Sequence, residues 1–285
     1  MSRLHALVFI PALLLVLLAL AVSPSTGADT PPLWQEVLPA KELAPLAEQV
    51  TLALKKHIDA LAGGKLEDDD RERAVKKARG LTLLLAAGVR TTEGKGIDAE
   101  LRAALHNATM KLDLALRKSK YMEAKAILAA LPTGKGFSIP AFTPAPLVEP
   151  TLRDDALAAL MVQYRTRSFG GLGVEPKPKD TMHDGLEAML KLVGDDGKHG
   201  LKPEELARFA YRLAVLAEAT RSLPPPKQVG PKDPAKWLHW SAEMRDASLE
   251  LATATATKSN RAAISKAALK IGRSCNDCHK VFRDN

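Results

Sequence analysis

The chain has 285 residues, of which 46% are hydrophobic, 26% are charged and only 4% are aromatic. This is the balance of a globular protein, and the shortage of aromatic residues beside abundant Ala and Leu favours helices over strands. The formal net charge is +8, but no long basic run is interleaved with aromatic residues, so nucleic acid is not a predicted partner. A basic surface would suit an acidic redox partner.

Residues 1–28 have the form of a secretory signal peptide. Arg3 precedes an apolar run interrupted only by Pro11, and small residues follow, with Ala28 as the expected last residue before cleavage. An uncleaved membrane anchor is the competing interpretation, because the run approaches the length that spans a bilayer. We expect an exported, periplasmic protein with no further membrane segment.

Residues 29–132 are predicted to form an N-terminal helical domain. Residues 40–64 and 67–92 each have a helical pattern, and residues 97–132 form one long helix or two. The acids at the start of 67–92 and the basic residues later in it suit the dipole of a helix. The stripe of the first segment comprises Leu43, Ala47, Val50, Leu54 and Leu61.

Residues 133–179 are predicted to be a linker that contains a short helix. Prolines are frequent from 138 to 150 and the helical period is absent there. A short helical segment follows, and then a loop rich in Gly and Pro. The "GGLG" of this loop lacks the preceding strand and the full glycine pattern of a nucleotide-binding loop.

Four amphipathic segments follow, at 180–194, 202–220, 233–256 and 259–284. Four helices with loops between them bury their apolar faces most simply in a four-helix bundle, here residues 180–285. The predicted stripes comprise Met182, Leu186, Met189 and Val193; Leu206, Phe209, Leu213, Leu216 and Thr220; Trp237, Trp240, Met244, Ala247 and Leu251; and Ile264, Ala268, Ile271, Cys275, Cys278 and Phe282. A match between "AKAILAALPTG" and "SKAALKIGRSC" hints that the first half is a degenerate duplicate.

The two cysteines of the chain lie together near its end, in "CNDCH", as Cys275, Cys278 and His279. A redox dithiol is one interpretation, but such motifs begin a helix after a strand, and no strands are predicted. Half of a zinc site is another, but no second Cys or His pair is present. The third is covalent haem c, with two thiols one helical turn apart for the haem vinyl groups and His279 facing the iron.

We therefore predict one covalent haem c, held by Cys275 and Cys278, with His279 as the proximal iron ligand. Only "KVFRDN" follows His279, so a second axial ligand must come from an upstream helix. Trp237 and Trp240 are core candidates first and haem neighbours second. His239, between them, is predicted to be a surface or satisfied histidine.

The ending "GRSCNDCHKVFRDN" resembles that of the class II c-type cytochromes, the cytochrome c-prime-like family. Gly272, the CxxCH, Phe282 and Arg283 match, and Trp237 matches a Trp early in the third helix of the family. The resemblance covers roughly residues 180–285. It implies a periplasmic monohaem protein, and such bundles often pair as homodimers. The distal residue of the family comes from its first helix, where Met182 and Met189 are candidates; a Met on such a stripe is more often core filler.

The leading functional prediction is one-electron transfer with a periplasmic redox partner. The alternative is binding of a small gas, NO or CO, by five-coordinate iron beside an apolar pocket of Met182, Leu186, Met189 and Phe209. A third hypothesis gives the N-terminal half a scaffolding or docking role. No nucleophile–base arrangement is visible, so an enzyme is not predicted.

Overall fold

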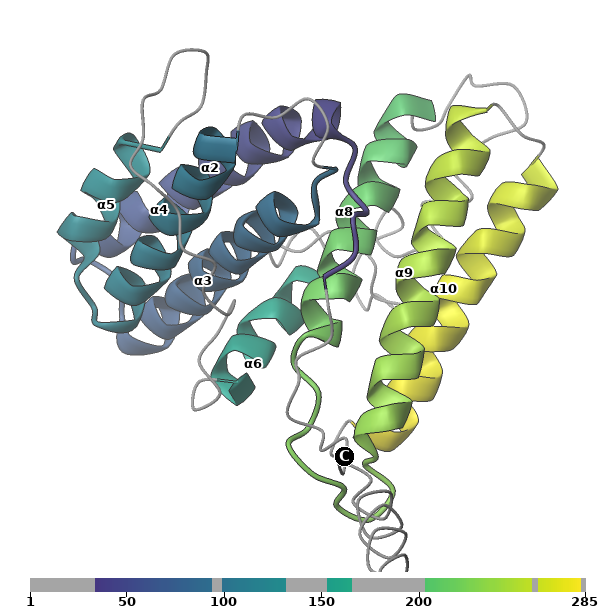
Figure 1. The fold of residues 1–285 in the computed structure, drawn as a ribbon. Coiled ribbons are helices and arrows are strands. Elements are labelled where there is room, and N and C mark those ends of the chain that lie inside the picture. Colours follow the sequence, from purple (N-terminus) through teal and green to yellow (C-terminus); the bar gives the residue numbers. More distant parts are fainter. Residues whose placement is uncertain (1–33, 94–98, 132–152, 166–202, 258–260, 283–285) are drawn as a thin grey trace, which may run out of the picture. The chain divides into compact units, whose positions relative to one another are not determined.

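Helices account for all the regular secondary structure in the part of the chain that the computed structural model describes, residues 34–93, 99–131, 153–165, 203–257 and 261–282. The all-α class is therefore confirmed. The elements are α2 (Ala40–Ala62), α3 (Asp68–Thr91), α4 (Ala99–Arg117), α5 (Tyr121–Ala129), α6 (Arg153–Gln163), α8 (Pro203–Arg221), α9 (Pro234–Ala256) and α10 (Arg261–Phe282) (Figure 1). The described part of the segment predicted as one long helix or two forms two helices, α4 and α5, and Ser119, at the break, adopts a φ of 55°.

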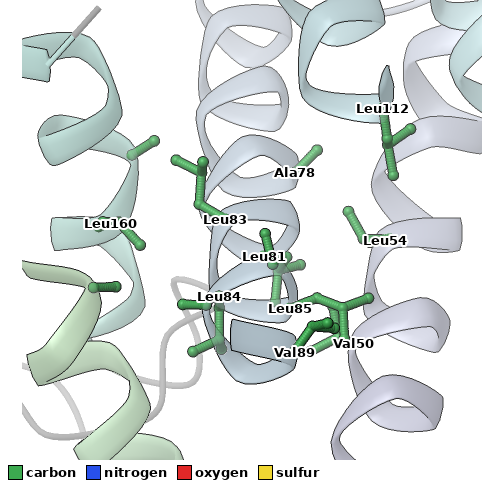
Figure 2. Packing of buried hydrophobic residues seen from close by; sticks show 14 of the residues in the cluster. Val50, Leu54, Ala78, Leu81, Leu83, Leu84, Leu85, Val89, Leu112 and Leu160 are labelled. Carbon is green, nitrogen blue, oxygen red and sulfur yellow. The ribbon is translucent and has the colours of Figure 1, made fainter. Parts of the chain in front are cut away.

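Helix α3 is the centre of the first half. It packs against α2, α4, α6 and α8, and its residues from Ala78 to Val89 are all buried. Leu83 and Leu84 point to the side of Leu160, whereas Leu85 and Val89 point towards Val50 (Figure 2). A helix that is apolar on all sides has to be covered on all sides, which explains the run "GLTLLLAAGV".

Helix α8 takes part in two hydrophobic cores. One side of it, including Val215 and Leu216, joins the core around α3. Another side, including Phe209 and Leu213, forms a second core with α9 and α10. The described parts of the two predicted halves therefore pack against each other through α8, while the predicted domain boundaries stay a prediction.

Helices α8, α9 and α10 match the last three amphipathic segments of the predicted bundle. Every stripe residue predicted for α8 is buried, from Leu206 to Thr220. Asp233 caps α9 by accepting a hydrogen bond from the Ala235 backbone N–H at 2.8 Å, and Pro234 opens the helix. The first predicted segment, 180–194, lies outside the described residues, as does the signal segment 1–28. The four-helix bundle therefore stays a prediction.

Glu218 holds α8, α9 and the segment before α2 together. It is 1% exposed, and its carboxylate accepts hydrogen bonds from the Gln35 backbone N–H at 3.0 Å, from Arg221 Nε at 2.9 Å and from Arg245 at 3.3 Å. Arg245 also pairs with Asp246. A buried carboxylate needs such partners, because an unpaired charge in the interior is costly.

His106, on α4, gives the fold a pH dependence. Its side chain is buried, Arg90 donates to its Nε2 at 3.2 Å, and burial followed by the Arg90 charge lowers its pKa to about 4. Between pH 6.5 and 4 the unfolded chain therefore binds a proton at this residue that the folded chain does not. We expect this to lower the free energy of unfolding by about 3 kcal/mol as the pH falls through that window.

The measurement is urea unfolding from pH 8 to 4, with wild type and His106→Gln compared at each pH. The difference in the free energy of unfolding between wild type and His106→Gln should vary with pH only below about 6.5. The surface variant His239→Gln should follow wild type. A constant difference between wild type and His106→Gln at every pH would refute the assignment.

Candidate functional site

The CxxCH lies on the last two turns of α10, which remains helical through Phe282. Ile264, Ala268 and Ile271 of its predicted stripe are buried in the second core. Cys275 continues this stripe and packs against the same core. Residues three and four apart share a helix face, so Cys275, Cys278 and Phe282 extend one continuous face. The helical period that buries α10 therefore also turns its thiols inward.

Both thiols are free and partly buried. Cys275 Sγ lies 4.0 Å from the Met244 sulfur of α9. Burial, followed by the charge of Cys278, raises the pKa of Cys275 to about 12, and burial raises the pKa of Cys278 to about 11. Burial thus favours the protonated form of both thiols, which is opposite to the depressed pKa expected of a redox dithiol.

These pKa values predict slow and unequal alkylation of the chain before any haem is attached. Cys278, whose pKa burial raises less than that of Cys275, should react with iodoacetamide faster than Cys275, because the thiolate is the nucleophile. Both rates should rise sharply in urea, which removes the burial. Mass spectrometry of timed samples at pH 8 checks this. Equal, rapid labelling in the folded chain would contradict the buried arrangement.

An aromatic cluster lies one turn beyond the thiols. The Phe282 ring meets Trp237 edge-on, with centroids 5.0 Å apart and an interplanar angle of 86°, and meets Trp240 at 6.0 Å and 81°. Trp237 is buried, and its indole Nε1 donates to the Thr220 carbonyl oxygen at 2.9 Å. Trp237 is thus buried, as the sequence predicted for a core residue, and its ring also contacts the motif helix through Phe282.

Two residues near the thiols were missed as site residues. Met244 was predicted only as a core residue of α9, yet its sulfur contacts Cys275. Tyr164 follows α6, in the predicted linker, and packs against the second core together with Cys275. The pattern of the linker carried no signal for Tyr164, because its position depends on how α6 docks on α3.

The histidines and methionines predicted for the site have different outcomes. His279 is exposed, in the last turn of α10. His239 is exposed and lies 3.4 Å from Glu243, which confirms it as a surface histidine. Met182 and Met189, the candidate distal ligands, lie outside the described residues. Phe209 is buried in the second core.

The donor set fits haem c better than it fits a metal bound by side chains alone. Within the described residues no three His, Cys, Asp or Glu side chains come together as a metal site. Cys275 and Cys278 offer two uncommitted thiols on one helix face, and His279 offers an imidazole in the next turn. Met244 contacts Cys275, and Phe282, one turn beyond Cys278, packs on Trp237, so this end of α10 carries the apolar and aromatic side chains that a haem plane requires.

Comparisons with protein-family models, curated proteins and solved structures found no match to this chain. Among the described helices, none has the length and apolar character needed to cross a membrane.

Proposed function

We propose that this chain is an exported monohaem c-type cytochrome that transfers single electrons to a periplasmic partner. The observation that carries the proposal is the CxxCH near the end of the last helix, with both thiols free and partly buried and with Cys275 packed against the core formed with α8 and α9. Its position and spacing suit covalent haem attachment, and the resemblance to the class II cytochromes supports the same assignment.

Each residue of the motif has a distinct role in this proposal. Cys275 and Cys278 would hold the haem by adding their thiols across its two vinyl groups, so that at each one the S–H bond and the vinyl π bond break and one C–S and one C–H bond form. His279 supplies the proximal imidazole. When bound, haem c would supply a one-electron iron couple. Trp237, Phe282 and Met244 keep water from this end of α10, and a drier environment favours the less charged, reduced state.

The proposal is tested on the full chain, exported by a host that attaches haem c. The haem should stay with the protein through acid extraction in organic solvent, because thioether bonds survive it. Optical spectra are then recorded oxidised, reduced, and reduced under CO. A reduced spectrum unmoved by CO indicates a strong sixth ligand and supports electron transfer. A high-spin spectrum that shifts with CO supports gas binding instead, and extractable haem overturns both proposals.

A further inference from the structure

Helix α6 is fixed against α3 by an unusually close contact. A Cβ at Gly80 of α3 would collide with the Ala159 carbonyl oxygen and the Gln163 side chain of α6. Only glycine permits this approach. Buried Arg79, the preceding residue, also donates to Asp155 of α6 and to Asp113 of α4. These contacts set the position at which α6 ends, and Tyr164 is the next residue.

The Tyr164 side chain points from this end of α6 towards α8. Its hydroxyl lies 2.9 Å from Thr220 Oγ1. Thr220 Oγ1 itself donates to the Leu216 carbonyl oxygen at 2.9 Å, so its single proton is used and Tyr164 is the donor. The Thr220 carbonyl oxygen accepts the Trp237 indole N–H. One residue of α8 therefore orients both Tyr164 and Trp237.

Tyr164 lies within electrostatic reach of the motif. Burial raises its pKa, and negative charge on Cys275 and Cys278 would raise it further. Tyr164 and Cys275 also pack against the same buried cluster of α8, α9 and α10. Tyr211 packs against that cluster too, but the charges that act on it are those of Glu42 and Glu93. Tyr164 also differs from Tyr211 in its contacts, because it bonds to Thr220, whose carbonyl oxygen holds Trp237 against Phe282 of α10.

We infer that Tyr164 is a positioning residue of the haem site, supplied by the segment that follows α6, with its hydroxyl held by Thr220 and its ring packed against the same core as Cys275. This rests on the proposed function. It also gives the N-terminal half a role: the docking of α6 on α3 delivers a polar group to a site otherwise built by the C-terminal helices. That group makes the haem surroundings more polar and so lowers the reduction potential.

The first test uses haem-loaded full-length protein and the variants Tyr164→Phe and Tyr211→Phe. Tyr164→Phe removes the hydroxyl and keeps the ring, so we expect a shift of the reduction potential to a higher value, measured by spectroelectrochemical titration. Tyr211→Phe, from the same core, should leave the potential unchanged. A Tyr164→Phe potential equal to wild type would overturn the inference, whatever the variant does to stability.

The second test needs no haem. In the full chain made without haem attachment, Tyr164→Ala should expose the thiols and raise the alkylation rate of Cys275 several-fold, whereas Tyr211→Ala should not. Circular dichroism establishes that each variant is folded. If Cys275 of Tyr164→Ala is alkylated faster but the chain never retains haem, Tyr164 does shield the thiols and the proposed function is refuted. If the chain retains haem but the Tyr164 variants change neither the reduction potential nor the alkylation rate, the inference about Tyr164 is refuted and the proposed function stands.

Discussion

Replacing both thiols, as Cys275→Ser with Cys278→Ser, should abolish covalent haem retention completely. Serine is nearly isosteric, but its hydroxyl is too weak a nucleophile to add across a vinyl group under the same conditions. Each single variant should retain haem through one thioether. Its reduced band should move to longer wavelength, because the remaining vinyl group stays conjugated with the ring. The measurement is acid extraction followed by an optical spectrum of the protein fraction.

The matched control for this experiment is Asn276→Ser, an exposed change between the two cysteines that leaves the motif spacing intact. It should retain haem as wild type does. Cys275 packs in the second core, so the fold of the double variant is checked by circular dichroism of the chain made without haem attachment. Covalent haem in a folded double variant would mean that the attachment point lies elsewhere.

The sequence predicted α2, α8 and α10 well because each carries an apolar stripe that packs against neighbouring helices. The α2 stripe from Leu43 to Leu61 and the α8 stripe from Leu206 to Thr220 are buried as predicted. A period of 3.6 residues needs no knowledge of the partner helix to indicate which face turns inward. The thiol pair follows from the same rule, since it continues the stripe of Ile264, Ala268 and Ile271.

The contacts that complete the site could not be predicted, because they depend on packing between distant segments. Tyr164 reaches Thr220 across 56 positions, and the Trp237 indole uses a backbone carbonyl, which no sequence pattern marks. The contact between Met244 and Cys275 depends on the register between α9 and α10. Local periodicity gives the inward face of each helix, but the register between helices arises only when side chains interlock.

Replacing Glu218 by Gln should lower the free energy of unfolding by about 3–5 kcal/mol, because it leaves buried Arg245 and partly buried Arg221 without their shared carboxylate. Arg245 would keep only Asp246, and Arg221 would face an amide that can present an N–H donor towards it. Urea unfolding at pH 7, followed by circular dichroism, measures the loss. The effect should be large because the Glu218 carboxylate is withdrawn from water and joins three segments of the chain.

The matched control is Glu250→Gln, which breaks the exposed pair with Lys270 that joins α9 to α10. Solvent screens that pair, so its loss should cost no more than about 1 kcal/mol. Glu218 lies two residues before Thr220, which orients Trp237 and Tyr164. Weaker packing between α8 and α9 should therefore also raise the alkylation rate of Cys275 in Glu218→Gln, but not in Glu250→Gln. Equal, small losses of stability in both variants would show that the buried carboxylate is dispensable, and that α8 and α9 are held by their apolar contacts alone.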